Sequence, residues 1–507
     1  MHGTATAVGH TREATGPTDK GEQMTETTRG TAGSPHWLIR VLPYLGQIAG
    51  VTILLGILGY PLLHWSHYRA APPWMGYIAI AIGFAVALTA IAWSGGLRLL
   101  LHWLGGLTHR AYMALLLPLC FVTHLAILRT IEILPGERAA NPFCDWVFFK
   151  ASAMYPRGHD LLMEAFRVLV LHSAWSNVLF TSIVVTVAAW LAYRLGAMAY
   201  GEPAGRLAGL VLAMFPSWMI YGNFEYDLLL GTLFLLLMYL FFVRPPEKHG
   251  FWYLAIWGLL VGATCLVKPT GTLAPLAAFL VYRAWRLPLG VAIKRAGIIA
   301  LFLILAISPW TIRNYLVLNH FVLVSTNFGV VLHTANNPES VGLEMTMLPL
   351  PGETDEVEMD HRHIREAVDW IISNPVQFLK LTAYRVTWTW GSDTGFINSN
   401  GCLYGKLPPI GLNAVRGVVQ IAYLATMFIW VAGGVIWRRR ILNSVLAVAM
   451  LSMVVYIWAI HLVMQAHCQH HLPVLPFIII LAVGTLAHRA GLLAVGATSP
   501  ATGKKGH

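Results

Sequence analysis

Residues 296–315 read AGIIALFLILAISPWTIRNY, and this stretch decides the fold class. An α-helix of about 20 predominantly apolar residues is long enough to cross the hydrocarbon core of a bilayer. The stretch has one charged residue, Arg313, near its end. We therefore predict a transmembrane helix here, and we look for others on either side of it.

Apolar runs of the same character recur along the chain. They lie at roughly 42–63, 74–94, 111–133, 166–192, 207–222, 228–243, 251–267, 270–285, 296–315, 415–437, 441–464 and 472–490. The run at 207–222 is short and is interrupted by Pro216. This pattern predicts an all-α polytopic membrane protein with about 12 transmembrane helices.

The composition supports the same class. The chain has 507 residues, of which 57% are hydrophobic and 11% are charged. Soluble globular proteins have about 25% charged residues. The composition excludes a soluble enzyme, a coiled coil, a disordered protein and a charge-dense nucleic-acid-binding domain, so we expect no nucleic-acid partner.

The formal net charge of +11 comes largely from short loops between the apolar runs. With the N-terminus inside, the inside loops contain Arg98, Arg194, Arg283 and the run Arg438–Arg440. Short cytoplasmic loops are enriched in Lys and Arg, so the pattern selects this orientation. Two long segments, 134–165 and 316–412, are then predicted to lie outside, and loops of that length usually carry function.

Both outer segments are predicted to contain helices. Asp145, the pair Phe148 and Phe149, and residues 151–154 are spaced for a short amphipathic helix on the membrane surface. In the second segment, a Gly- and Asn-rich loop precedes an amphipathic helical pattern that is broken near Pro375.

Five stretches in this order resemble the GT-C superfamily of integral-membrane glycosyltransferases. The resemblance is to the bacterial branch related to protein O-mannosyltransferases and to the lipid A aminoarabinose transferase. The stretches are CDWVFFKASA (144–153), EPAGRLAGLVLAMFPSW (202–218), GLLVGATCLVKPTG (258–271), ISPWTIRNYLVLNHFVLVSTNFGVVLHTANNP (307–338) and HHLPVLPF (470–477). At the start of this last stretch, His470 and the preceding Gln469 stand where the family has Tyr and Arg.

The resemblance implies a division of the chain into four parts. Residues 1–36 would be a disordered cytoplasmic tail, because they are rich in Thr and Gly and have few large apolar side chains. Residues 37–110 would add two transmembrane helices to a glycosyltransferase core at 111–490, and 491–507 would be a second cytoplasmic tail. The implied location is the bacterial cytoplasmic (inner) membrane, with the active site on the extracytoplasmic side.

The resemblance also implies a reaction. Such enzymes take a sugar from a polyprenyl-phosphate-linked donor and pass it to a glycolipid, polysaccharide or protein acceptor at the membrane. An inverting displacement needs a carboxylate base for the acceptor hydroxyl. The resemblance places Asp145 at the catalytic aspartate of the family. Asp160, later in the same loop, is the second candidate, and an exposed aspartate that caps a helix is the alternative reading of Asp145.

The leaving polyprenyl phosphate needs cationic groups at the membrane surface. Lys268 and Arg313 are predicted at the outer ends of spans, beside Pro269 and just past Pro309, and we predict that they share the phosphate. Lys150 is a weaker candidate. Each could instead reach the membrane interface without binding a ligand.

Further polar residues are candidate contacts for the sugar or the acceptor. Amides both donate and accept hydrogen bonds, and carboxylates and imidazoles are also suited to such contacts. These candidates are Asn336, Asn337, Glu225, Asp227 and His470. An ordinary turn would explain the Asn pair equally well, and a solvated turn explains the acidic pair better than a contact does.

No cofactor is certain from the sequence, although a divalent metal ion is possible. His467, His470 and His471 lie beside Cys468, and imidazole and thiolate bind zinc, but this spacing matches no familiar zinc motif. The five cysteines form no CxxC pair and predict no particular disulfide.

The sequence leaves two non-catalytic functions as alternatives to a glycosyltransferase. A transporter or flippase of lipid-linked sugars would also be a basic polytopic chain, but it would be expected to show related halves and polar sites near mid-span. A non-catalytic assembly subunit would tolerate the loss of Asp145. The candidate residues gather in the two outer segments, which favours a glycosyltransferase.

Overall fold

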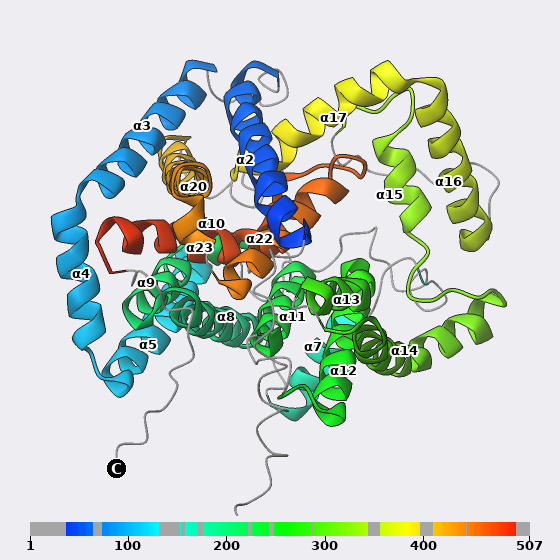
Figure 1. Ribbon diagram of the computed structural model, residues 1–507. Helices are drawn as coiled ribbons and strands as arrows, with labels where there is room; N and C mark the ends of the chain where they lie inside the picture. Colours follow the sequence, from blue (N-terminus) through cyan, green and yellow to red (C-terminus); the bar gives the residue numbers. More distant parts are fainter. Residues whose placement is uncertain are drawn as a thin grey trace, which may run out of the picture.

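The computed structural model describes residues 37–63, 73–130, 153, 158–170, 176–221, 226–242, 248–284, 287–342, 355–395, 409–442 and 444–492. These residues form α-helices and two longer 3-10 helices, and none of them lies in a β-strand (Figure 1). The predicted all-α class is therefore confirmed.

The first described helices correct the expected loop around Arg98. They are α2 (Trp37–Leu63), α3 (Pro73–Ala92), α4 (Ser94–Gly106) and α5 (His109–Thr130). Instead of a loop, α4 follows α3 at an angle of 72°. Its Leu97, Leu101 and Leu104 are buried on one face, and burying that apolar stripe stabilises the helix.

The middle of the chain follows the expected apolar runs closely. It contains α7 (Gly158–Leu169), α8 (Ser176–Tyr200), α9 (Glu202–Ala213), α10 (Pro216–Tyr221), α11 (Tyr226–Phe242), α12 (Phe251–Val267), the 3-10 helix η4 (Pro269–Leu273), α13 (Ala274–Ala284) and α14 (Leu289–Leu318). The predicted interruption at Pro216 is confirmed, because α9 ends before it and α10 begins with it.

The second outer segment contains the predicted broken helix. It comprises α15 (Phe328–Ala335), α16 (Glu356–Ser373) and α17 (Pro375–Trp390), so the break falls at Asn374. The C-terminal part consists of α20 (Pro409–Ile436), α21 (Arg438–Ile441), α22 (Val445–Ile460), the 3-10 helix η5 (Cys468–Val474) and α23 (Leu475–Arg489).

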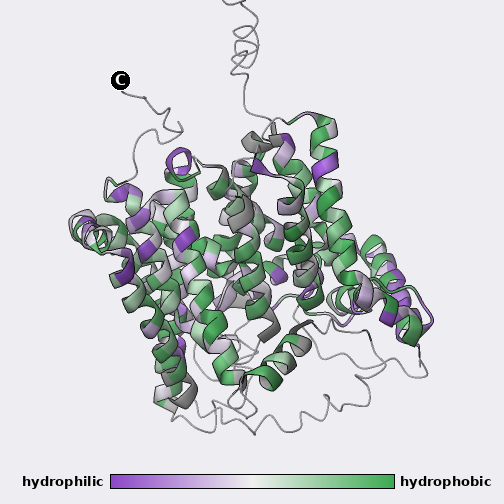
Figure 2. Ribbon diagram, turned by 90° about the horizontal axis from the view of Figure 1, so that it is seen from below, coloured by the Kyte–Doolittle hydropathy of each residue, from purple (hydrophilic) through white to green (hydrophobic). Residues whose placement is uncertain are grey.

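Several helices are suited to a bilayer, but the count of 12 spans is not confirmed. Five described helical segments are long and apolar enough to cross, or six if the bent pair α3–α4 is one span. Shorter apolar segments occur in α11, α12 and α22. The sides of the bundle are predominantly hydrophobic (Figure 2). Many large apolar side chains are exposed, for example Leu55, Leu305 and Ile436, as expected of a multi-pass membrane protein.

The centre of the bundle is α23, which is surrounded by other helices (Figure 1). Its residues Leu475–Thr485 are all buried. The ring of Phe477 packs on that of Tyr239 from α11, with centroids 4.6 Å apart. A helix that is apolar on every side lies in a protein core or in lipid, and in α23 the neighbouring helices cover the buried residues.

Two basic residues, Arg98 of α4 and Arg438 of α21, lie at one end of the bundle, which we call the basic end. Arg98 donates to the carbonyl of Ala490 at 2.9 Å, and Arg438 donates to the Gln47 side chain at 2.8 Å. The opposite end, the site end, contains Tyr60 of α2, whose ring packs edge-on against Trp388. The basic end and the site end lie apart, as expected if successive spans cross the membrane in opposite directions. The side of the membrane that each end faces stays a prediction.

Cysteine labelling tests that orientation. In a cysteine-free background we expect an impermeant maleimide to label Glu339→Cys, but not Arg439→Cys, in intact cells. Both positions are exposed, so access to the reagent decides the result. Labelling of both variants after permeabilisation is the control, and labelling of position 439 in intact cells would reverse the orientation.

Candidate functional site

Polar residues gather at the site end, although most of the bundle interior is apolar. They come from the end of α12, from α17 and the residues after it, from the end of α22 and from η5. We call this group the site-end cluster: Lys268, Arg385, Asp393, His461, His470 and His471. Ionisable groups are costly in such surroundings, which makes the cluster a candidate functional site.

Lys268 lies where the sequence places it, immediately after α12. Its backbone is extended, with φ −140° and ψ 122°, as is typical of a residue that precedes proline. Its N–H closes the helix by donating to Thr264 at 2.7 Å. The half-buried side chain runs past Gly231 of α11, where an added Cβ would lie 3.5 Å from the Lys268 Cγ.

His461 and His470 stack beside Lys268. Their ring centroids are 4.3 Å apart and their planes differ by 17°. The Nδ1 of His461 donates to the carbonyl of Gln465 at 2.9 Å. Burial lowers the pKa of His461 to about 4, and the nearby positive charge of Lys268 acts in the same direction. At neutral pH, Lys268 therefore supplies positive charge next to a neutral His461 imidazole.

Arg385 is fully buried and holds three segments together. Its guanidinium donates to the Leu462 carbonyl at 2.8 Å and to the Asn336 Oδ1 at 2.6 Å, and also to the carbonyl of Ala335. Burial lowers the pKa of Arg385 to about 10, so the group stays cationic at neutral pH.

The predicted sugar contacts Asn336 and Asn337 lie at the end of α15. The Nδ2 of Asn336 donates to the carbonyls of Leu332 and Val463 at 2.8 and 2.9 Å. Asn337 donates to His333 and accepts from the N–H of Glu339, both at 2.8 Å. These bonds build a turn, and a role for either amide in sugar binding stays a prediction.

Asp393 and His471 form a buried pair that sequence reasoning did not find. Both side chains are 0% exposed, and the His471 Nε2 lies 3.1 Å from the Asp393 Oδ1. The His471 Nδ1 faces the Thr389 carbonyl at 2.7 Å. Among the described residues, the Asp393 Oδ2 has no hydrogen-bond partner. The signal in the sequence was a single acidic residue in the aromatic stretch WTWGSDTG.

Arg313 lies just past Pro309, near the end of α14, and its role as a phosphate ligand stays a prediction. Helix α14 continues through Pro309 to Leu318. Proline leaves the carbonyl of Leu305 without its helical donor, and the Ser308 hydroxyl donates to it at 2.9 Å, which helps the helix to continue.

The described contacts of Arg313 differ from those of Lys268. Its guanidinium lies 4.8 Å from the Trp310 ring centroid and donates to the Asn314 Oδ1 at 3.1 Å. Asn314 in turn donates to the carbonyls of Val322 and Val324. The shared phosphate clamp of Arg313 and Lys268 therefore stays a prediction.

The other candidate residues are described only in part. Asp145, Lys150 and Glu225 lie outside the described residues. Asp160 lies in α7 and Asp227 in the first turn of α11, and only their backbones are described.

Ala153 shows how the two outer segments meet. Its N–H donates to the Glu356 side chain at 2.6 Å, and its carbonyl accepts from the N–H of Thr326 at 3.1 Å. Ala153 is buried against Val322 and Val357. The expected surface helix therefore does not include Ala153, because its backbone groups bond to distant partners. The remainder of that predicted helix lies outside the described residues.

The three histidines beside Cys468, which are His467, His470 and His471, do not converge as metal ligands. His471 faces Asp393, whereas the Nδ1 of His467 accepts from the N–H of Gln469 at 3.4 Å. The rings of His467 and His470 meet edge to face, with centroids 6.5 Å apart. No disulfide joins the described cysteines, which are Cys120, Cys265 and Cys468.

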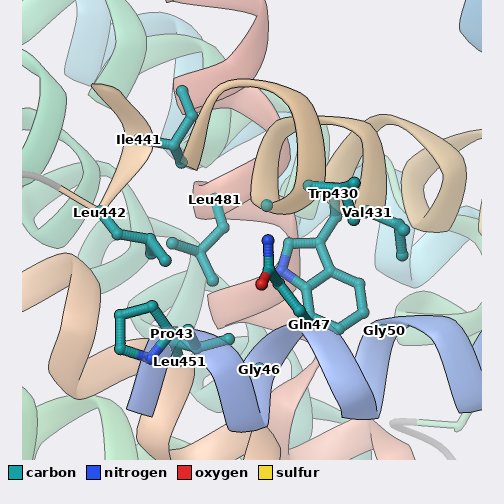
Figure 3. Close-up of a pocket in the computed structure, with 12 residues that line it drawn as sticks. Pro43, Gly46, Gln47, Gly50, Trp430, Val431, Ile441, Leu442, Leu451 and Leu481 are labelled. Atoms are coloured by element: carbon teal, nitrogen blue, oxygen red, sulfur yellow. The ribbon is translucent and has the colours of Figure 1, made fainter. Parts of the chain in front are cut away.

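A small cavity lies away from the site-end cluster, between α2, α20, α22 and α23 (Figure 3). Its lining includes Pro43, Trp430, Leu451 and Leu481, and its volume is about 20 Å³. A water molecule needs at least about 10–15 Å³ of such volume, so the cavity is far too small for a sugar or a lipid phosphate.

The predicted resemblance to GT-C membrane glycosyltransferases is confirmed over part of the chain. Residues 156–312 match the family model described as dolichyl-phosphate-mannose-protein mannosyltransferase. This range contains α7 to α13, most of α14, and Lys268.

Among solved structures, the chain is similar to ArnT from Cupriavidus metallidurans bound to undecaprenyl phosphate. The identity is 12%, the match covers 67% of this chain and 68% of that one, and the TM-score is 0.31. No curated protein sequence matches the chain.

Proposed function

We propose that this protein transfers a sugar from a polyprenyl-phosphate-linked donor to an acceptor at the extracytoplasmic face of the membrane. The family match at residues 156–312 supports this proposal, because the matching family is described by its use of a polyprenyl-phosphate sugar. The acceptor is a glycolipid, a polysaccharide or a protein hydroxyl.

The observation that carries the proposal is the position of Lys268. It lies within the matched range, directly after an apolar helix and beside the stacked pair His461 and His470. A polyprenyl chain lying along apolar helices would present its phosphate at the depth of such a helix end. A half-buried ammonium at that depth is suited to hold the phosphate.

In the proposed reaction, the acceptor hydroxyl loses its proton to Asp145 as its oxygen attacks the anomeric carbon. A new glycosidic bond forms, and the bond from the anomeric carbon to the phosphate oxygen breaks. The polyprenyl phosphate leaves with the electron pair, and Lys268 stabilises its growing negative charge. Attack opposite the leaving group inverts the anomeric centre.

A transfer assay in detergent tests the function. The purified full-length chain, given a radiolabelled polyprenyl-phosphate sugar, is expected to move the label into an acceptor fraction. A flippase cannot label an acceptor, because it forms no new covalent bond. In detergent there are also no two membrane sides between which it could move the donor. The proposal fails if no acceptor class becomes labelled while proteoliposomes of the same protein move the donor across the bilayer.

A further inference from the structure

Three potential metal ligands converge in the second outer segment, away from the site-end cluster. They are His333 on α15 and the pair His363 and Glu366 on α16. One ligand atom from each lies within 4.8 Å of the other two. The range that matches the mannosyltransferase family ends before all three residues.

The helix pair holds these side chains in place. The Asp360 Oδ1 on α16 accepts from the N–H of Gly329 at 2.6 Å and from that of Val330 at 3.4 Å, which fixes the first turn of α15. A Cβ on Gly329 would overlap the Asp360 carbonyl oxygen, so only glycine permits this close approach. His363 and Glu366 are three residues apart and therefore share one face of α16.

The three side chains contact one another, and one neighbouring cation, Arg362, competes for the carboxylate. The His333 Nε2 lies 3.4 Å from the Glu366 Oε2, and the rings of His333 and His363 are 4.8 Å apart. Arg362 faces the other carboxylate oxygen, with its Nε 3.5 Å from Oε1. Burial lowers the pKa of His333, which favours the neutral imidazole that a metal ion requires.

We propose that His333, His363 and Glu366 bind a divalent transition-metal ion of the zinc class, which joins α15 to α16. Two imidazoles and a carboxylate form a ligand set that zinc uses in proteins. Tetrahedral coordination would bring the ligand atoms to about 3.3 Å from one another, and small side-chain rotations suffice for this. His363 is 5% exposed, whereas the side chains of His333 and Glu366 are 26% and 44% exposed, so a water molecule can take the fourth position.

Binding at this site would also stiffen the region next to the site-end cluster. Helix α15 ends at Ala335, and the next residue, Asn336, accepts from Arg385 of that cluster. A metal ion that fixes α15 on α16 would therefore stabilise one side of the cluster without contacting a substrate. The inference does not depend on the proposed glycosyltransferase activity.

Metal analysis of the full-length, tag-free protein tests the site. After loading with ZnCl2 and desalting, the wild type is expected to retain about one zinc ion per chain. His333→Gln, His363→Gln and Glu366→Gln should each lose it. His361→Gln is the matched control, because His361 lies exposed on the same helix outside the group, and His470→Gln controls for the other histidines. Both controls should keep the ion.

Thermal unfolding distinguishes the loss of a metal-binding side chain from misfolding of the variant. Zinc should raise the Tm of the EDTA-treated wild type but not that of Glu366→Gln, whose metal-free Tm should match the metal-free wild type. Arg362→Gln should bind zinc more tightly, because it removes the cation that competes for Glu366. The proposal is overturned if the wild type binds no more zinc than the triple Gln variant, or if His470→Gln abolishes binding while the three variants retain it.

Discussion

Asp145→Asn is expected to lower sugar transfer by about 10²- to 10⁴-fold, the usual contribution of a general base. Asparagine has nearly the same size as aspartate but cannot take the proton of the acceptor hydroxyl. Donor binding and the Tm should change little, because the substitution removes a proton acceptor and adds no bulk. Initial rates at saturating lipid-linked donor measure the effect.

Two companion variants make the Asp145 experiment specific. Asp145→Glu keeps a carboxylate and should retain more activity than Asp145→Asn, although its longer side chain misplaces the base. Asp160→Asn should remain active. Normal turnover by Asp145→Asn would exclude Asp145 as the base and direct attention to Asp160 or Glu225.

The structure gives a physical reason to expect the Asp145 loop near the second outer segment. Both backbone groups of Ala153, in the same loop, bond to that segment through Glu356 and Thr326. Their burial with Val322 fixes one point of the loop there. The position of Asp145 itself comes from the resemblance, through its place in CDWVFFKASA.

The sequence predicted most helices well, because long apolar runs have one dominant explanation in a chain of this composition. The runs at 251–267 and 74–94 correspond to α12 and α3 within a few residues. The break near Pro375 was also predictable, because proline is tolerated at the start of a helix and disrupts its interior.

One local error, the loop expected around Arg98, has an identifiable cause. Helix α4 contains Gly95, Gly96 and Arg98, which indicate a loop, and its stability comes from burying Leu97 and Leu101 against neighbours that are distant in sequence. Helix α14, in contrast, continues past Pro309, as the apolar run at 296–315 predicts. The Ser308 hydroxyl satisfies the Leu305 carbonyl, and this compensation depends on side-chain geometry rather than on residue type alone.

The sequence predicts a residue of the candidate site only where neighbouring residues in the chain mark its position. Lys268 before Pro269 marks a helix end from two neighbouring residues. In contrast, the contact of Arg385 with Leu462, and that of Asp393 with His471, joins residues far apart in the chain. One sequence contains no information on such pairs until the packing of α17 against η5 is known.

Lys268→Ala is expected to weaken donor use by about 10- to 100-fold. A hydrogen bond to a charged group contributes about 1.5–3 kcal/mol, and about 1.4 kcal/mol corresponds to a factor of ten. The loss should be larger at low donor concentration, because the ammonium is proposed to hold the phosphate before the reaction as well as during it. Rates measured over a range of donor concentrations separate the effect on KM from that on kcat.

The same helix supplies the matched control for Lys268. Lys248 lies exposed just before α12 begins, whereas Lys268 lies just after it ends, so the two ammonium groups flank one apolar helix. Lys248→Ala also removes one positive charge beside α12, but at the end away from the site-end cluster, and it should leave transfer unchanged. Lys268→Arg keeps the charge and should recover part of the activity. If Lys248→Ala and Lys268→Ala impair transfer equally, the charge acts on membrane insertion of α12 and not on the donor phosphate.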